Sequence, residues 1–319
     1  MVVASRCLGF EHCRYNGQMV RDPLVEALQP LVEFITPCPE KDIGLGVPRH
    51  PVRIVKAEGE SRLQQMATGE DVTGRMNAFL DTFMEGLEGV DGFILKSRSP
   101  SCGLTDVKHY PPGEKKPPLE KGAGMFGERV LNEYSDFAVE DEARLSNHRI
   151  RHHFLTKLFT LADYRRVEET GRARDLVDFQ ARNKLLFMAY SQKEMREMGR
   201  IVAHQDETGL KDAMGEYRAH LHAALSKGIN YKSNINVLEH AFGYVSKELG
   251  DEERAFFLDS LEMFREDRTP LVTLLNILRA WILRFDVQYL REQTYFRPYP
   301  VDLQRKFSRY RSKEYWDRT

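Results

Sequence analysis

The first half of the chain alternates short apolar runs with amphipathic stretches. The segments MVVASRCL, FITPCP, PVRIV and GFILKS are short and apolar, which indicates buried strands. Between them, residues 23–34 and 72–87 carry apolar side chains at helical spacing, with Pro23 in a first turn and Thr73 as an N-cap. Strands that alternate with helices predict an α/β fold, with a mostly parallel, Rossmann-like sheet flanked by helices.

The second half has the periodicity of helices throughout. Apolar residues recur there at three- and four-residue intervals with charged residues between them. The predicted helices cover residues 144–169, 182–205, 210–225, 235–249, 253–267 and 270–290. We therefore predict an α/β domain at residues 1–142 and an all-α helical domain at residues 143–319.

Residues 107–121 break the pattern of the first half. They contain four prolines and several charged residues, and this composition predicts a surface loop without regular structure. The following segments, GAGMFGERVLNEY and FAVEDE, return to a helix and a last strand.

Composition and charge add a division that the whole-chain totals hide. The 319 residues are 41% hydrophobic and 30% charged, a globular balance, and they suggest two domains. Residues 1–142 hold 16 Lys and Arg against 23 Asp and Glu, a net charge of −7, whereas residues 143–319 have a net charge of +6. An acidic half joined to a basic half suggests that the halves have different partners.

Neither a membrane nor a secretory location is expected. No apolar run approaches the roughly 20 residues that span a bilayer. The N-terminal segment becomes polar too soon for a signal peptide. We therefore expect a cytoplasmic protein.

Three of the four cysteines follow predicted strands. Cys7, Cys38 and Cys102 each lie beside a glycine or a proline, or one residue from it, just after an apolar run. Ligands of open α/β sheets bind at the carboxyl ends of strands. If the strands are parallel, these thiols converge at one edge of the sheet.

Three interpretations of these cysteines remain open on the residues alone. They can be small buried side chains. They can bind zinc, with His12, His50 or His109 as a further ligand, although the usual closely spaced cysteine pairs are absent. They can also hold an iron–sulfur cluster through three thiolates, which leaves one iron open.

The motifs around these cysteines resemble the thiouracil desulfidase (TudS) family. The resemblance rests on Cys7-Leu-Gly with Arg14-Tyr15-Asn16-Gly17, on Cys38-Pro-Glu40, and on Ser99-Pro-Ser101-Cys102-Gly103. It covers about residues 1–142. The remainder is similar to the YbgA-type helical domain, through RNKLLFMA at residues 182–189 and MGRIVA at residues 198–203. Such fusions resemble desulfidases of the RudS type, which remove sulfur from 4-thiouridine in tRNA.

The resemblance implies a cofactor and a reaction. The cofactor is a [4Fe–4S] cluster held by Cys7, Cys38 and Cys102, with one open iron that binds the thiocarbonyl sulfur. The reaction is hydrolytic, without a redox step: oxygen from water replaces the sulfur, and sulfide leaves. Cys13 lies where the family usually has an apolar residue, so it is not expected to be a ligand.

The same motifs imply roles for other residues. Glu40 would act as the acid or base, and Ser99 would orient the substrate or relay a proton. The substrate-binding candidates are Arg14, Tyr15, Arg49 and Ser101.

The basic half suggests a nucleic-acid partner. Phosphate groups supply much of the affinity of proteins for RNA, so a tRNA enzyme benefits from basic residues that a free-base enzyme does not need. Two segments are candidates. One holds Arg144, Arg149, Arg151, Lys157, Arg165 and Arg166, and the other is the tail from Arg297, with Tyr299, Phe307, Tyr310, Tyr315 and Trp316 among its basic residues.

Three functions follow as alternatives. The first is an iron–sulfur-dependent desulfidase of 4-thiouridine in tRNA. The second is a desulfidase of free thiouracil-type bases. The third is a non-catalytic RNA-binding or stress protein with a structural metal.

Overall fold

A four-stranded parallel sheet forms the centre of the first half of the chain. The structure, a computed structural model, describes residues 1–57, 59–113 and 116–307. The strands of this sheet are β1 (Val2–Ala4), β2 (Phe34–Ile35), β5 (Gly92–Leu95) and β8 (Ala138–Asp141). Their order is β2-β1-β5-β8, and every neighbouring pair is parallel. The predicted α/β fold is confirmed.

Four helices accompany these strands: α1 (Pro23–Leu28), α2 (Pro39–Asp42), α3 (Thr73–Glu85) and α4 (Met125–Glu133). Helix α1 begins as predicted, because the Asp22 carboxylate accepts hydrogen bonds from the next turn and Pro23 follows it. Thr73 is not the N-cap of α3. Val72 holds that place, and the Thr73 hydroxyl instead accepts a bond from the Leu63 amide at 2.8 Å.

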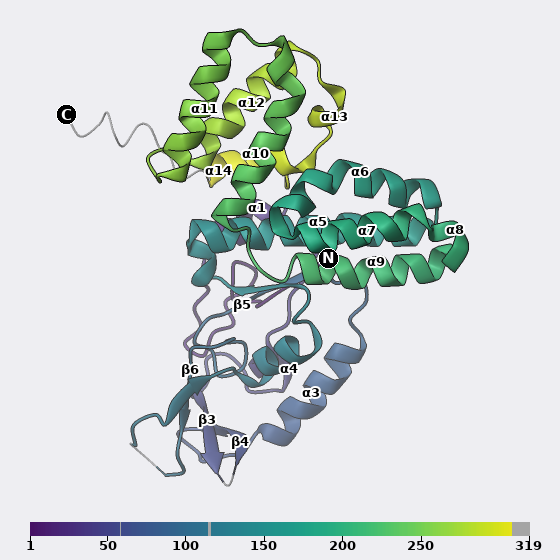
Figure 1. Cartoon of the computed structure of the whole chain (residues 1–319). Coiled ribbons are helices and arrows are strands. Elements are labelled where there is room, and N and C mark those ends of the chain that lie inside the picture. The colour runs from purple at the N-terminus through teal and green to yellow at the C-terminus, as the bar shows by residue number, and fades with distance from the viewer. Residues whose placement is uncertain (58, 114–115, 308–319) are drawn as a thin grey trace, which may run out of the picture. The chain divides into compact units, whose positions relative to one another are not determined.

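A second sheet corrects the prediction for residues 107–121. It contains β3 (Val52–Ala57), β4 (Glu60–Gln65), β6 (Val107–Tyr110) and β7 (Glu120–Gly122), in the order β4-β3-β6-β7. The prediction of a loop was wrong at both ends, since β6 and β7 pair antiparallel. Val107 and His109 are buried and Lys108 is exposed, so a two-residue alternation was present within the polar composition. Figure 1 shows β3, β4 and β6 gathered together.

The rest of the described chain is helical, as predicted. Its helices are α5 (His148–Thr170), α6 (Ala173–Tyr190), α7 (Gln192–Ala203), α8 (Gln205–Thr208), α9 (Leu210–Ala224), α10 (Tyr231–Val245), α11 (Asp251–Arg265), α12 (Leu271–Arg284), α13 (Gln288–Arg291) and α14 (Val301–Lys306), with short 3-10 turns at Arg144–Ser146, Ser246–Glu248 and Thr294–Phe296. The predicted helix 182–205 is divided at Ser191. The backbone of Ser191 is extended, and the Ser191 hydroxyl caps α7 by accepting a hydrogen bond from the Glu194 amide.

The chain folds into two compact units. Of the described residues, the first contains those up to 162 together with residues 305–307, and the second contains residues 163–304. The change from α/β to helical structure follows β8, whereas the division between the units lies within α5. Each unit has its own apolar core. In the first, Phe93 and Phe126 are fully buried, and in the second, Leu238 and Phe257 are. In Figure 1, α7 and α9 lie side by side in the second unit.

No helix among residues 1–57, 59–113 and 116–307 is both long enough and apolar enough to cross a membrane.

Two glycines allow α4 to press against the loop that carries Cys102. A Cβ atom at Gly127 would lie 2.1 Å from the Gly103 carbonyl oxygen, and one at Gly124 would lie 2.6 Å from that of Ser101. This close approach lets the amides of Phe126 and Gly127 donate to the Ser101 carbonyl at 2.8 and 3.1 Å. The start of α4 therefore fixes the course of the loop.

Gly127→Ala is expected to lower the free energy of unfolding by about 1–3 kcal/mol, because the added Cβ must displace backbone. Gly74→Ala is the matched control. It lies in the first turn of α3 with nothing within 4 Å of its Cβ, so it should be neutral or slightly stabilising. Urea unfolding of the full chain measures both. Equal stability of the two variants would contradict the packing argument.

Candidate functional site

A pocket of about 620 Å³ lies at the carboxyl ends of β1, β2 and β5. It collects residues that are far apart in the sequence. The predicted residues that line it are Cys7, Cys38, Cys102, Glu40, Ser99, Arg14, Tyr15 and Arg49. The three thiols come from the chain segments that follow three adjacent parallel strands, and this is the convergence that the sequence pattern predicts.

Backbone and side-chain bonds hold Cys38 in place. Cys38 immediately precedes α2, and its amide donates to the Asp42 carboxylate at 3.0 Å. The Arg6 guanidinium donates two hydrogen bonds, of 2.8 and 3.0 Å, to the same carboxylate. Its Nε also donates to the Thr36 carbonyl at 2.7 Å. The segment after β1 and the segment after β2 are thereby joined by charge-assisted hydrogen bonds.

The Ser-Pro-Ser-Cys loop after β5 is a turn capped by its own hydroxyl. Ser99 Oγ accepts from the amides of Ser101 and Cys102 at 3.2 and 3.1 Å. Both lone pairs of this hydroxyl are therefore used, and its proton is left to donate. Cys102 itself is 6% exposed and is the most enclosed of the three candidate ligands.

A buried ion pair, Arg49 with Glu40, lies among the residues that line the pocket. Arg49 donates through Nε to Glu40 Oε2 at 2.8 Å, and its Nη2 lies 2.8 Å from the same oxygen. The Arg49 side chain is 4% exposed and that of Glu40 is 12% exposed. Ser101, which is fully buried, donates to Glu40 Oε1 at 3.1 Å. The carboxylate thus has a fixed orientation. Arg49 occupies Oε2 through two nitrogens, whereas Oε1 accepts only from Ser101 and has one further lone pair available.

Cys13 lies in the same pocket, which the sequence did not indicate. Its side chain is fully buried, and it lines the pocket together with Cys7 and Cys38. The Cys13 carbonyl accepts a 2.9 Å bond from Arg49 Nη1 and a 3.7 Å contact from Cys38 Sγ. The spacing of Cys13 from Cys7 gave no signal, because only the fold of the intervening turn brings them together.

The thiols hold their protons strongly when only protein surrounds them. Burial raises the pKa of Cys102 to about 12. The contact with Cys13, together with burial, raises the pKa of Cys38 far above its usual range. For Cys13, the bond with Cys38 lowers the pKa, but the bond with Cys7 and burial outweigh it and raise the pKa to about 11. Binding of a metal by these residues must therefore displace protons.

A second polar network in the pocket was missed by the sequence interpretation. Lys96 forms an ion pair with Glu142, and both side chains are largely buried. Ser97 joins them: its amide and hydroxyl donate to Glu142 at 2.7 and 2.8 Å. Lys96 and Glu142 follow β5 and β8 directly, so strand-end position was the signal that could have identified them.

Arg14 and Tyr15 line the outer part of the pocket. The Arg14 guanidinium lies 5.9 Å from the centre of the Tyr15 ring, and Tyr15 is 42% exposed. The backbone carbonyl of Tyr15 accepts from the Arg49 amide at 2.8 Å, which ties this turn to the ion pair. An exposed aromatic ring and a guanidinium beside a pocket suit a planar or anionic ligand.

The donor set of the pocket is of the kind that iron–sulfur clusters use, because the three predicted ligands are thiols that line one pocket. Zinc uses thiolate donors as well. Within the part of the chain that the structure describes, no group of three or more His, Cys, Asp or Glu side chains is spaced to hold one metal ion.

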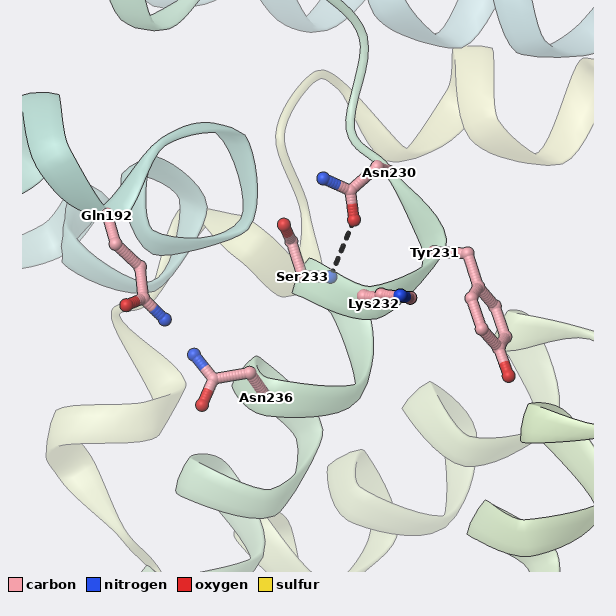
Figure 2. A pocket seen from close by; sticks show the side chains of 6 residues that line it. All are labelled: Gln192, Asn230, Tyr231, Lys232, Ser233 and Asn236. Atoms are coloured by element: carbon pink, nitrogen blue, oxygen red, sulfur yellow. Dashed lines mark hydrogen bonds between the residues drawn. The ribbon is translucent and has the colours of Figure 1, made fainter.

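A second hollow, of about 480 Å³, lies in the helical unit (Figure 2). Gln192, at the start of α7, and Asn236, on α10, point toward each other across it, while Tyr231 lies on its other side. Its lining, drawn entirely from described residues, offers amides, hydroxyls and Lys232 but no thiol, imidazole or carboxylate. It therefore lacks the groups that hold iron or activate water, and the cysteine pocket is the candidate site.

The basic segment at residues 144–166 is only partly available to a ligand. Arg149 and Arg166 are exposed, but Lys157 is 6% exposed and cannot reach a phosphate. Three others have partners close by: Arg144 and Arg165 pair with Glu140 and Glu169, and Arg151 bonds the Leu145 and Ser146 carbonyls. Of the tail aromatics, Tyr310, Tyr315 and Trp316 lie outside the described residues.

Comparison with known proteins yields a family for each half. Residues 2–142 match the model of the 2-thiouracil desulfurase family, and residues 184–300 match that of a family of unknown function, DUF1722. Uncharacterized protein YbgA of Escherichia coli (strain K12) is 32% identical over 149 residues, which are 46% of this chain and 88% of YbgA. Uncharacterized protein YbbK of Bacillus subtilis (strain 168) is 33% identical over 117 residues, 32% of this chain and 73% of YbbK.

Among solved structures, a [4Fe–4S]-dependent thiouracil desulfidase, TudS, is 27% identical to this chain. The matched region covers 46% of this chain and 92% of the TudS chain, with a TM-score of 0.36.

Arg49→Ala is expected to lower the free energy of unfolding by about 3–5 kcal/mol at neutral pH, because it leaves the buried Glu40 carboxylate without its counter-charge. Arg62→Ala, which removes an exposed ion pair with Glu60, is the control and should cost about 0–1 kcal/mol. Adding Glu40→Gln to Arg49→Ala should restore part of the loss. If the changes in the free energy of unfolding from the two substitutions simply added, Arg49 and Glu40 would not interact as an ion pair.

Proposed function

Because the chain belongs to the 2-thiouracil desulfurase family through residues 2–142, with a DUF1722 domain at residues 184–300, we propose that it is a desulfidase of thiolated nucleobases. The thiocarbonyl compound and water would give the carbonyl compound and hydrogen sulfide, with no net oxidation or reduction. One observation carries the proposal: three thiols from adjacent strand ends share a pocket with a carboxylate of fixed orientation.

Cys7, Cys38 and Cys102 are the residues that would hold a [4Fe–4S] cluster. Support comes from their position around one pocket and from a donor chemistry that suits iron. When bound with one open iron, the cluster supplies a thiophilic Lewis acid for the thiocarbonyl sulfur. Binding would release the thiol protons, and Lys96 and Glu142 are the other ionisable pair that lines the pocket.

Glu40 is the group that would move the proton of the attacking water. Arg49 and Ser101 fix its two oxygens, and Oε1, which accepts only from Ser101, still has room for one donor. A water held there loses its proton to the carboxylate as it adds to the ring carbon, and Glu40 can return that proton to the departing group. Arg49 and Ser101 then act through Glu40 and not on the substrate directly.

Ser99, Arg14 and Tyr15 would bind the base. The Ser99 hydroxyl has its proton free of the backbone and can direct it to an acceptor atom of the ring. Tyr15 offers an exposed face for stacking, and Arg14 offers a guanidinium for a phosphate or a carbonyl. These groups line the same pocket as the thiols, and the exposed Tyr15 is accessible to a nucleotide in solvent.

We further propose 4-thiouridine in tRNA as the substrate. Support comes from the net charge of +6 on residues 143–319 and from the exposure of Arg149 and Arg166 on α5. Exposed basic residues add affinity for a phosphate backbone, which a free base does not have. A tRNA substrate would place the enzyme in the cytoplasm. Free thiouracil-type bases are the alternative, and they need only the cysteine pocket.

The cofactor and the acid–base role can be tested together on anaerobically purified protein. The wild type should contain iron and sulfide and absorb broadly near 400 nm, and Cys7→Ser, Cys38→Ser and Cys102→Ser should each lose most of both. Glu40→Gln should keep the iron but release sulfide from 4-thiouridine about 10²–10⁴-fold more slowly. The proposal would be contradicted if the wild type bound zinc and no iron. It would also be contradicted if the protein bound RNA without any change to the base.

Competition between substrates tests the tRNA assignment. The kcat/KM for 4-thiouridine in tRNA should exceed that for free 4-thiouracil and should fall steeply as salt rises, whereas the free-base value should hardly change. Arg149→Glu should lower the tRNA value alone. Arg62→Glu, another exposed arginine, serves as the control. A salt-independent preference for the free base would favour the alternative substrate.

A further inference from the structure

One face of the second sheet carries a row of positive charges. In the register of β3 with β6, Ile54 lies opposite His109, so the residues before them, Arg53 and Lys108, also lie side by side. Lys108 in turn lies directly opposite Lys121 on β7. These three cations, which we call the basic row, cross three neighbouring strands on one face. Strands are about 4.8 Å apart, so the basic row is roughly 10 Å long.

The basic row is on the solvent side of the sheet. Successive residues of a strand point to opposite faces, and Ile54 and His109, which adjoin the row in sequence, are buried. Lys108 and Lys121 are exposed, and Arg53 is half-buried. Neither lysine forms an ion pair with any residue that the structure describes. Their ammonium groups are therefore available to a ligand.

Neither stability nor protection of the sheet edge accounts for the whole row. Like charges that lie directly opposite each other on paired strands destabilise a sheet, so the Lys108–Lys121 pair is a cost to the fold. Lysines on an edge strand prevent sheets from pairing with one another, which is reason enough for Lys121 on β7. Arg53 and Lys108 need another reason, because β3 and β6 are the two central strands of the sheet.

Two acidic residues of the same face have partners of their own. Asp71 bridges to Gln64, the neighbour of Arg53 on β4, and its carboxylate accepts from the Thr73 amide at 2.9 Å. Glu60 lies in another row and pairs with Arg62, at 3.6 Å. These carboxylates do not neutralise the basic row, so its charge favours an anionic ligand.

The surroundings of the basic row favour a nucleic acid among anionic ligands. The Arg53 guanidinium lies 5.3 Å from the centre of the Tyr110 ring, which is on the same face. Arg53 donates to the Gly113 carbonyl at 2.7 Å, while its Nε has no hydrogen-bond partner among the described residues. Cations beside an aromatic ring suit phosphate contacts next to a stacked base, whereas an acidic peptide offers no base to stack.

The basic row begins where the wall of the cysteine pocket ends along the chain. Pro51 and Val52 line that pocket, and Arg53 follows them in β3. We propose that the basic row binds the phosphate backbone of an RNA whose thiolated base occupies the cysteine pocket. The inference rests on the proposed function, because a free base has no phosphate for the row to bind.

The double variant Lys108→Gln/Lys121→Gln of the full chain tests the inference. Its affinity for unmodified tRNA should fall about tenfold, and the slope of log affinity against log salt should decrease by about two, one for each lost phosphate contact. Sulfide release from free 4-thiouracil should stay unchanged, because neither lysine lines the pocket. Lys56→Gln is the matched control for each single substitution. It lies on the opposite face of β3 and pairs with Glu120, so it should bind tRNA as the wild type does.

Unfolding in urea separates loss of binding from loss of fold. The midpoint should stay the same or rise slightly in the double variant, since two opposed like charges are removed. A folded double variant with the tRNA affinity and salt slope of the wild type overturns the inference and leaves the desulfidase proposal intact. Binding of poly-glutamate as tight as that of tRNA makes this face a site for acidic proteins and overturns the inference as well. If the double variant loses tRNA affinity but the wild type desulfurates neither tRNA nor free base, the RNA contact stands and the proposed function fails.

Discussion

The parallel pairing of β1 with β2 on one side and β5 on the other is the constraint on which the site depends. Because the three strands run in one direction, the segments that follow them leave the sheet at the same edge. Each of those segments carries one of the candidate ligands, Cys7, Cys38 or Cys102. Reversal of one strand would move its cysteine to the opposite edge, and the remaining two thiols could not hold a cluster with an open iron.

Fixing the thiols requires more than the sheet, because loops at strand ends are otherwise adaptable. Charge-assisted bonds between Arg6 and Asp42 join the segment that holds Cys7 to helix α2, which follows Cys38. The close approach of α4 through Gly124 and Gly127 holds the Cys102 loop. The Arg49–Glu40 pair joins the remaining turn, since Arg49 bonds to the Cys13 carbonyl as well. The groups that hold the candidate catalytic carboxylate therefore also hold the thiols, so their spacing is set jointly.

The division of charge between the halves gains a more precise meaning from the structure. The +6 charge of residues 143–319 is not a uniform basic surface, because Arg144 and Arg165 are paired with acidic neighbours and Lys157 is buried. What remains for a polyanion is a smaller set of exposed arginines. Burial and ion pairing decide which basic side chains are available to bind a polyanion, and sequence composition reports neither.

The sequence by itself determined the α/β and helical halves, the strand-end position of the three cysteines and the motifs around them. These features depend on local spacing, which a linear pattern records. It did not indicate that residues 107–121 contain β6 and the start of β7, because the few buried side chains there, such as Val107, are surrounded by proline and charge. Nor did it show that Cys13, Lys96 and Glu142 line the pocket, or that Ser101 donates a hydrogen bond to Glu40. Those facts depend on contacts between distant segments, which only the tertiary structure decides.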